Sequence, residues 1–218
     1  DGDANKYVTG WISKDNDYLF GDIIPVPDSR GNRFQNYIAK INNEGDFVWV
    51  NTIGSSYSIY NYSSIDTDQE GGLYISFPFR DKLYLNENIE LDANYEGSYN
   101  SCVVKFNNEG VVQWIKTMAS LGRSNTAGVA VANNGDVALG GYFRNLGTFK
   151  ENLDITAKGS RKGFLATIEG EELLTTDHNF VIDKNMKVYP NPSFGYCTIH
   201  VAALDLFQEE VYVQVMDL

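Results

Sequence analysis

Short runs of alternating or β-branched hydrophobic residues recur along the first three quarters of the chain, with polar turns between them. The run KYVTGWI at residues 6–12 is answered by LYISFPF at 73–79 and by VALGGYF at 137–143. A second set reads YIAKI at 37–41, CVVKF at 102–106 and FLATI at 164–168. Such runs are typical of strands, and no helical period lies between them. The pattern predicts an all-β protein built from tandem repeats of about 65 residues.

The turns repeat as well as the strands. INNEGDFVW at residues 41–49 returns as FNNEGVVQW at 106–114. Asn-Asn-Glu-Gly predicts a hairpin that reverses through a type I turn, with glycine in the left-handed position. Trp49 and Trp114 would then anchor the following strand. Four antiparallel strands in each repeat are the sequence signature of a propeller blade, so we expect repeats at about 1–65, 66–130 and 131–173.

The repeats resemble the SBBP-like β-propeller repeats of bacterial secreted proteins. The matching residues are NKYVTGW at 5–11, Ala39, Lys40 and Trp49, while the second copy keeps Lys105, Gly110 and Trp114. The third copy keeps the GDV and GGYF elements but lacks the tryptophan strand. A propeller ring needs about four to eight blades, so we expect these repeats to be part of a larger propeller in a longer protein.

The pattern changes after residue 173. An acidic, irregular stretch is interpreted as a linker over residues 174–185, and MKVYPNPSFG at 186–195 then starts a new domain. Two prolines one residue apart give a stiff entry into a turn, and two alternating strands follow. This segment, residues 186–218, resembles the start of the type A C-terminal sorting domain of the type IX secretion system of Bacteroidetes. The resemblance implies a truncated immunoglobulin-like β-sandwich, and its motif residues are Tyr189, Pro190, Asn191, Pro192 and Gly195.

Charge and composition exclude several partners. Seventeen basic against 29 acidic residues give a net charge of −12, which disfavours nucleic acid and anionic bilayers. No run is long and apolar enough for a transmembrane helix. Cys102 and Cys197 both lie in strand-like runs and are interpreted as buried thiols, with a disulfide between them as the alternative.

Metal chemistry has one candidate motif. Asp66-x-Asp68-x-Glu70-Gly71 imitates the opening of a calcium loop, as does Asp1-x-Asp3-x-Asn5. Neither has an acidic residue at the twelfth position, where Phe77 and Ile12 stand. We therefore predict ordinary inter-strand turns and no cofactor, with calcium as the alternative.

Catalysis has weaker support. The two histidines, His178 and His200, fall in the linker and in a sorting-domain strand, without neighbours that would position a base. The strands expected to line a propeller channel, residues 8–10, 74–76 and 138–140, carry no acid for a glycosidase-type pair. The sequence therefore predicts a protein that is not an enzyme.

Ligand binding has five candidate residues. Trp11, Phe77 and Tyr142 recur at similar intervals and could form a carbohydrate-stacking ring, or could fill the space between neighbouring repeats. Arg80 and Arg144 follow the first strand of their repeats, where a ligand loop or a solvated turn would lie.

Together these features predict a secreted or cell-surface binding or adhesion propeller. The resemblance implies export by the type IX machinery in the outer membrane, with a carbohydrate or protein ligand at an extracellular location. The alternative is a secreted hydrolase, such as a glycosidase, whose catalytic residues lie outside this segment.

Overall fold

All regular elements that the structure describes are β-strands, which confirms the predicted all-β class. The computed structural model describes residues 2–57, 63–86, 88–93, 95–150, 153–168, 196–202 and 210–216. The strands are β1 (Lys6–Ser13), β2 (Phe34–Ile41), β3 (Phe47–Ser55), β4 (Ser64–Thr67), β5 (Leu73–Arg80), β6 (Lys82–Asn86), β7 (Ile89–Asp92), β8 (Tyr99–Phe106), β9 (Val112–Ser120), β10 (Ser124–Val131), β11 (Val137–Lys150), β12 (Leu153–Ile168), β13 (Tyr196–Ala202) and β14 (Glu210–Met216). One sheet has the order β1-β2-β3-β6-β7; the other runs β13-β14-β12-β11-β9-β8-β5-β4, with β10 on β11.

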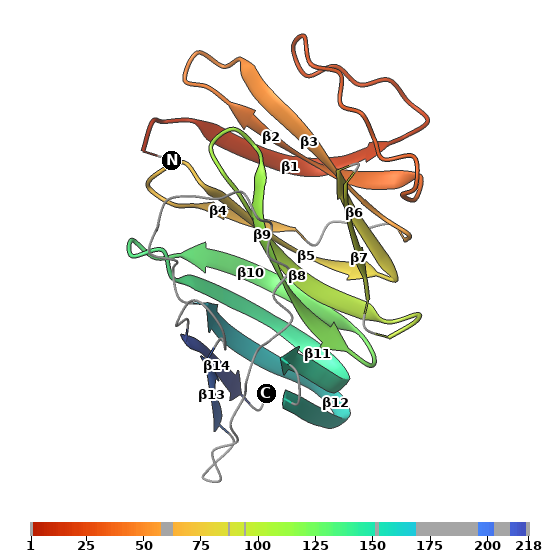
Figure 1. Ribbon diagram of the computed structural model, residues 1–218, viewed down its shortest axis with the longest axis vertical. Coiled ribbons are helices and arrows are strands. Elements are labelled where there is room, and N and C mark those ends of the chain that lie inside the picture. The colour runs from red at the N-terminus through yellow and green to blue at the C-terminus, as the bar shows by residue number, and fades with distance from the viewer. Residues whose placement is uncertain are drawn as a thin grey trace.

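The strands group into three units that follow one another along the chain. Unit 1 is β1, β2 and β3; unit 2 is β4, β5, β8 and β9 with the hairpin β6–β7; unit 3 is β10, β11 and β12. Their registers correspond, because Tyr7 lies opposite Lys40 in unit 1 as Tyr74 lies opposite Lys105 in unit 2. Figure 1 shows the units as successive layers from the red N-terminal end downward.

Unit 2 has the complete antiparallel meander β4-β5-β8-β9. The edge strand is the short β4, and β5 lies between β4 and β8. The expectation that residues 74–76 form the innermost strand is therefore wrong for this unit. The short β4 lies at this edge although its four residues, SIDT, carry no long hydrophobic run.

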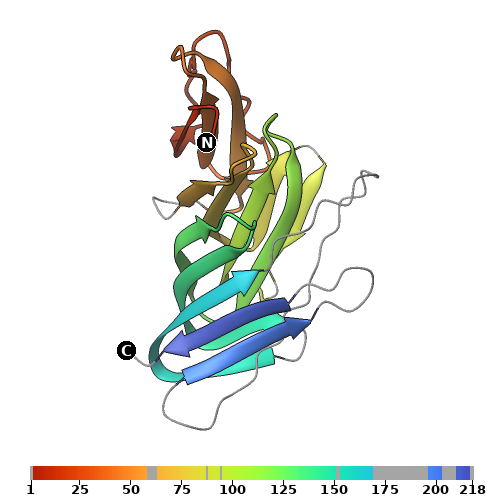
Figure 2. The same ribbon diagram turned by 90° about the vertical axis from the view of Figure 1, so that its left-hand side faces the viewer.

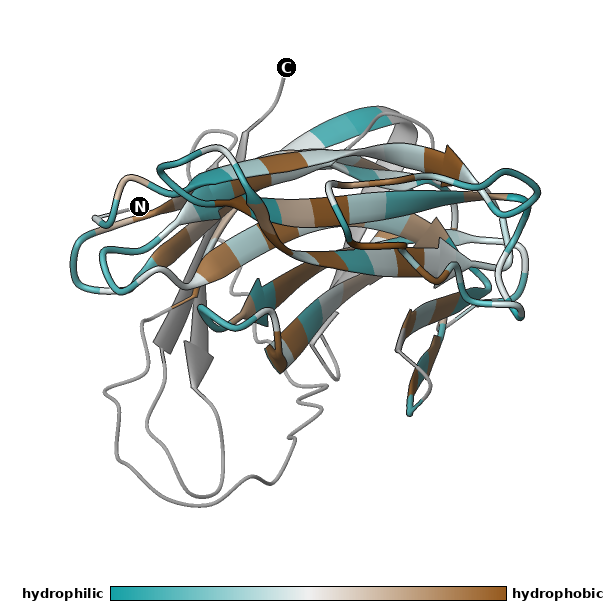
Figure 3. Cartoon of the chain, turned by 90° about the horizontal axis from the view of Figure 1, so that it is seen from above, coloured by the Kyte–Doolittle hydropathy of each residue, from teal (hydrophilic) through white to brown (hydrophobic). Residues whose placement is uncertain are grey.

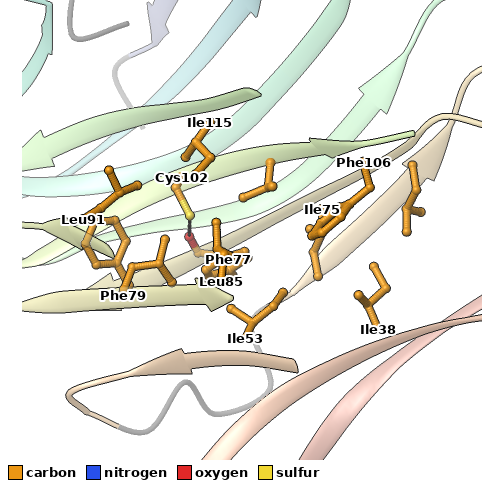
Figure 4. Packing of buried hydrophobic residues seen from close by; sticks show 13 residues of the cluster. Ile38, Ile53, Ile75, Phe77, Phe79, Leu85, Leu91, Cys102, Phe106 and Ile115 are labelled. Atoms are coloured by element: carbon orange, nitrogen blue, oxygen red, sulfur yellow. Dashed lines mark hydrogen bonds between the residues drawn. The ribbon is translucent and has the colours of Figure 1, made fainter. Parts of the chain in front are cut away.

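Both faces of unit 2 are buried, and each face belongs to a different core. Leu73, Ile75, Phe77 and Phe79 of β5 pack toward unit 1, in a cluster that includes Ile38 and Ile53 (Figure 4). The alternate residues Tyr74, Val103, Trp114 and Met118 pack on unit 3, against Val129, Leu139, Phe143 and Phe164. Because successive side chains in a strand point to opposite faces, a strand covered on both sides is largely hydrophobic, as β5 is apart from Ser76 and the terminal Arg80.

Neighbouring units are joined by the same contacts at each junction. The end of β3 pairs with β6, and the end of β9 pairs with β11 at Ser120 and Gly147. The hydroxyl of Ser55 donates to the Arg80 carbonyl at 3.2 Å, and that of Ser120 donates to the Arg144 carbonyl at 3.3 Å. The repeated sequence therefore codes for a repeated junction.

The NNEG hairpins form as predicted. Gly45 and Gly110 have φ values of 97° and 80°, and their amides donate to the carbonyls of Asn42 and Asn107. The Asn107 side chain also accepts from the amides of Glu109 and Val111, which fixes the turn. Glycine is needed here because a positive φ strains residues that have a Cβ.

The C-terminal hairpin lies beside unit 3. β13 and β14 pair along their length, and β14 pairs with β12 at Leu165 and Ala166 (Figure 2). The predicted linker at 174–185 and the motif residues Tyr189, Pro190, Asn191, Pro192 and Gly195 lie outside the described residues.

Candidate ligand-binding rim

The three aromatic residues proposed from the sequence do not form one ring. Phe77 is fully buried in the core between units 1 and 2, whereas Trp11 is 48% exposed and packs edge-on against Phe34 at 5.3 Å. Tyr142 is partly exposed, with the Arg161 guanidinium 4.8 Å from its ring centroid. Only Trp11 and Tyr142 could therefore reach a ligand.

Strand register explains the difference. Equivalent register positions in the three units are occupied by Trp11, Pro78 and Tyr142, which lie opposite Asn36, Ser101 and Gly163. The counterpart of Trp11 and Tyr142 in unit 2 is therefore Pro78. Phe77 is one position earlier. A shift of one residue moves a side chain to the other face of the sheet, which places Phe77 in the core.

Arg80 lies in an aromatic environment at the end of β5. Its guanidinium carbon is 3.9 Å from the ring centroid of Tyr57 and 5.7 Å from that of Tyr99. Among the described residues its Nε atom is buried with no hydrogen-bond partner, and the Asp81 carboxylate lies 3.8 Å from it. The guanidinium is thus held by rings and retains unused donor capacity.

Arg123 and Arg144 extend this cluster into unit 3. The guanidinium of Arg123 lies 5.3 Å from the Tyr99 ring centroid, and the Arg144 amide donates to the Arg123 carbonyl at 2.9 Å. Both arginines are exposed. We call Tyr57, Arg80, Tyr99 and Arg123 the arginine–tyrosine rim; it combines residues of unit 2 with residues of the segments that follow β3 and precede β10.

The sequence indicated only part of this rim. Arg80 and Arg144 were candidates because they end equivalent strands, and the structure brings them to the same end of the molecule. Tyr57, Tyr99 and Arg123 were missed, because they lie at chain reversals with no recurring pattern. The signal that could have found Tyr99 is its position directly opposite Arg80 on the neighbouring strand.

Another exposed arginine, Arg30, is already paired with acids. Arg30 bonds Asp28, stacks 4.6 Å from the Tyr84 ring centroid and lies near Glu90. The Arg30 bond lowers the pKa of the Asp28 carboxyl below its usual range. Because this guanidinium is neutralised locally, it is a weaker anion site than the rim.

The motif at Asp66 to Gly71, with its resemblance to a calcium loop, forms an inter-strand turn, as predicted. One oxygen of Asp68 accepts from the amides of Glu70 and Gly72, and the other lies 3.2 Å from the Tyr74 hydroxyl. Asp66 instead accepts from the amide of Val131 in unit 3. No cluster of three or more metal-binding side chains occurs within the described ranges.

Cys102 is a free, buried thiol, as predicted. Its Sγ donates to the Phe77 carbonyl at 3.4 Å, and burial raises its pKa well above the ordinary value (Figure 4). A thiol in this state is a poor nucleophile. The side chains of Cys197 and His200 are not described, and His178 lies outside the described residues.

No protein-family model matches the chain, and no curated protein is significantly similar to it. Among the described residues there is also no helix long and apolar enough to cross a membrane.

Proposed function

We propose that this protein is a non-enzymatic binding module, a β-propeller-type array whose arginine–tyrosine rim binds an acidic carbohydrate at the cell surface. The observation that carries the proposal is the rim itself, where the buried Nε of Arg80 has no hydrogen-bond partner within the described part of the chain and the guanidinium lies between two tyrosine rings. The tandem units support the propeller assignment, since unit 2 holds a four-stranded antiparallel meander and buries its two faces against units 1 and 3.

The chemistry of the rim favours an acidic ligand. A guanidinium presents a planar set of donors that matches a carboxylate, and two of them lie on Tyr99. The ring of Tyr57, 43% exposed, adds an apolar surface beside them. A chain with a net charge of −12 repels polyanions in general, so this local positive charge would direct an acidic chain to one place.

Removing the rim arginines is expected to remove binding. The full chain should bind a galacturonic acid hexamer by calorimetry, and Arg80→Ala with Arg123→Ala should weaken binding by about tenfold or more, since each charge-assisted bond contributes about 1.5–3 kcal/mol. Arg33→Ala is the control, because Arg33 is an exposed arginine that lies outside the rim and pairs with Asp15 at 2.7 Å. Equal affinity of the double variant, or equal binding of a neutral galactose hexamer, would contradict the assignment.

We also propose that the C-terminal segment directs export through the type IX system. The proposal rests on YPNP at residues 189–192, with Gly195 and the two alternating strands that follow. Strands β13 and β14 form over 196–202 and 210–216, which is consistent with a β-rich sorting segment.

Deletion of residues 187–218 is expected to abolish surface display. The measurement is surface labelling of cells of a Bacteroidetes host that produces the protein. Because β14 pairs with β12, the deletion also exposes an edge of unit 3. The double variant Pro190→Ala and Pro192→Ala avoids this, and it should lower display while circular dichroism of the purified protein stays unchanged. Undiminished surface signal from both proteins would exclude a sorting role.

A further inference from the structure

The first junction shows what one unit does to the next. The Lys40 amine and the Trp49 indole N–H both donate to Asn108 in the NNEG turn of unit 2, and the Asn51 amide donates to the Gly110 carbonyl at 2.6 Å. The turn is seated so closely that a Cβ on Gly110 would lie 2.8 Å from the Trp49 ring. Lys40, Trp49 and Asn51 form the turn cradle.

The same turn in unit 1 has no cradle. A Cβ on Gly45, the counterpart of Gly110, would meet nothing within 4 Å. The residues between Asn42 and Phe47 are exposed. An identical sequence is therefore docked in one copy and open in the other.

The segment after β1 shows the same contrast. In unit 2 the corresponding hairpin, β6–β7, pairs with β3 of unit 1, and its Leu83, Leu85 and Leu91 are 0, 5 and 8% exposed. In unit 1 the residues Leu19, Ile24 and Val26 are 75, 65 and 80% exposed. The end of β3 pairs with β6 of unit 2. No described strand end pairs in this way with the apolar segment at 19–26 of unit 1.

The edge of unit 1 is also open. β4 covers β5 and β10 covers β11, but β1 is the last strand of its sheet. Ala4 has a φ of 58°, at the position that Gly71 and Gly135 hold with φ of 80° and 87° in the turns that lead from β4 and β10. Residues 2–5 thus keep the geometry of a hairpin turn whose first strand would pair with β1. Figure 3 looks onto this outer face, where hydrophobic and polar bands alternate along the strands.

We infer that the outer face and open edge of unit 1 bind one further unit of this same repeat, together with the strand that leads from that unit into the turn at residues 2–5. Its cradle would seat the turn at 42–45, and the end of its outer strand would pair with the segment at 19–26. One occupant accounts for all three open features. Unit 1 itself makes the first two contacts on unit 2, where it seats the NNEG turn and pairs with the hairpin β6–β7. The strand ahead of the turn at residues 2–5 would make the third contact, by pairing with β1. The inference does not depend on the arginine–tyrosine rim.

The test joins a second copy of residues 64–131 directly to Asp1 of the full chain. This places the copied Val131 opposite Lys6, as Val131 lies opposite Val137 in unit 3. Amide exchange in peptides covering 19–26 and 42–46 should slow by about tenfold or more, since docked segments exchange only on opening. In the control fusion, the added copy carries Trp114→Ala, and protection at 42–46 should be lost while that at 6–13 remains.

A smaller fusion covers the case in which the added unit does not fold. Joining only residues 120–131 to Asp1 supplies the missing strand in register and requires no independent domain. Exchange in residues 6–13 should slow in this protein as well. Unchanged exchange at 6–13 in the strand fusion would overturn the inference. Unchanged exchange at 19–26 and 42–46 in the unit fusion would also overturn it, provided that the unfolding enthalpy has grown with the length of the chain, which shows that the added unit is folded.

Discussion

Replacing Phe77 with alanine is expected to lower the free energy of unfolding by about 3–5 kcal/mol, the usual cost of truncating a buried phenylalanine. Phe77 is 0% exposed, and it lies among Ile75, Phe79 and Leu85 in the core that joins unit 1 to unit 2 (Figure 4). The loss combines the transfer of the ring to water with the cavity left behind. Urea unfolding followed by circular dichroism measures it.

Trp11→Ala is the matched control for Phe77→Ala. The Trp11 ring is nearly half exposed and contacts mainly Phe34, so its removal should change stability by about 1 kcal/mol or less. The comparison separates packing from ligand contact among the aromatics singled out from the sequence. A loss for Trp11→Ala as large as that for Phe77→Ala would contradict the register that turns the Trp11 ring away from the core.

Gly141→Ala is expected to destabilise the protein by about 1–3 kcal/mol, as overpacking a closed interior does. A Cβ at Gly141 would overlap the carbonyl oxygen of Asn125 and lie 2.7 Å from the Phe164 ring. The Asn125 oxygen is backbone, so the sheet itself must move. Thermal unfolding with a fixed scan rate would show the loss as a lower Tm.

The adjacent glycine is the control for this substitution. A Cβ at Gly140 would meet nothing within 4 Å, and its φ is not positive. Gly140→Ala should therefore leave stability unchanged or raise it by up to about 1 kcal/mol, because alanine restricts the unfolded chain. Equal losses at both positions would show that the clash at Gly141 is not the cause.

Local structure was largely predictable because it depends on near neighbours in the chain. The alternating runs placed β1, β2, β5 and β8 closely, and Asn-Asn-Glu-Gly predicted its turn from the backbone freedom of Gly45 and Gly110. The burial of Cys102 followed from its hydrophobic strand. The lateral position of β5 did not, since strand order depends on pairings that a single run does not encode.

The sequence by itself determined the all-β class, the repeat of about 65 residues and the turns, since these follow from side-chain period and backbone preference. Only the tertiary structure decided which face each residue joins. It placed Phe77 in the core and left Trp11 half exposed, and it brought Arg80 of β5, Tyr99 of β8 and Arg123, just before β10, together. The physical reason is that face and contact depend on register and on the packing of one unit against the next, which are long-range properties of the folded chain.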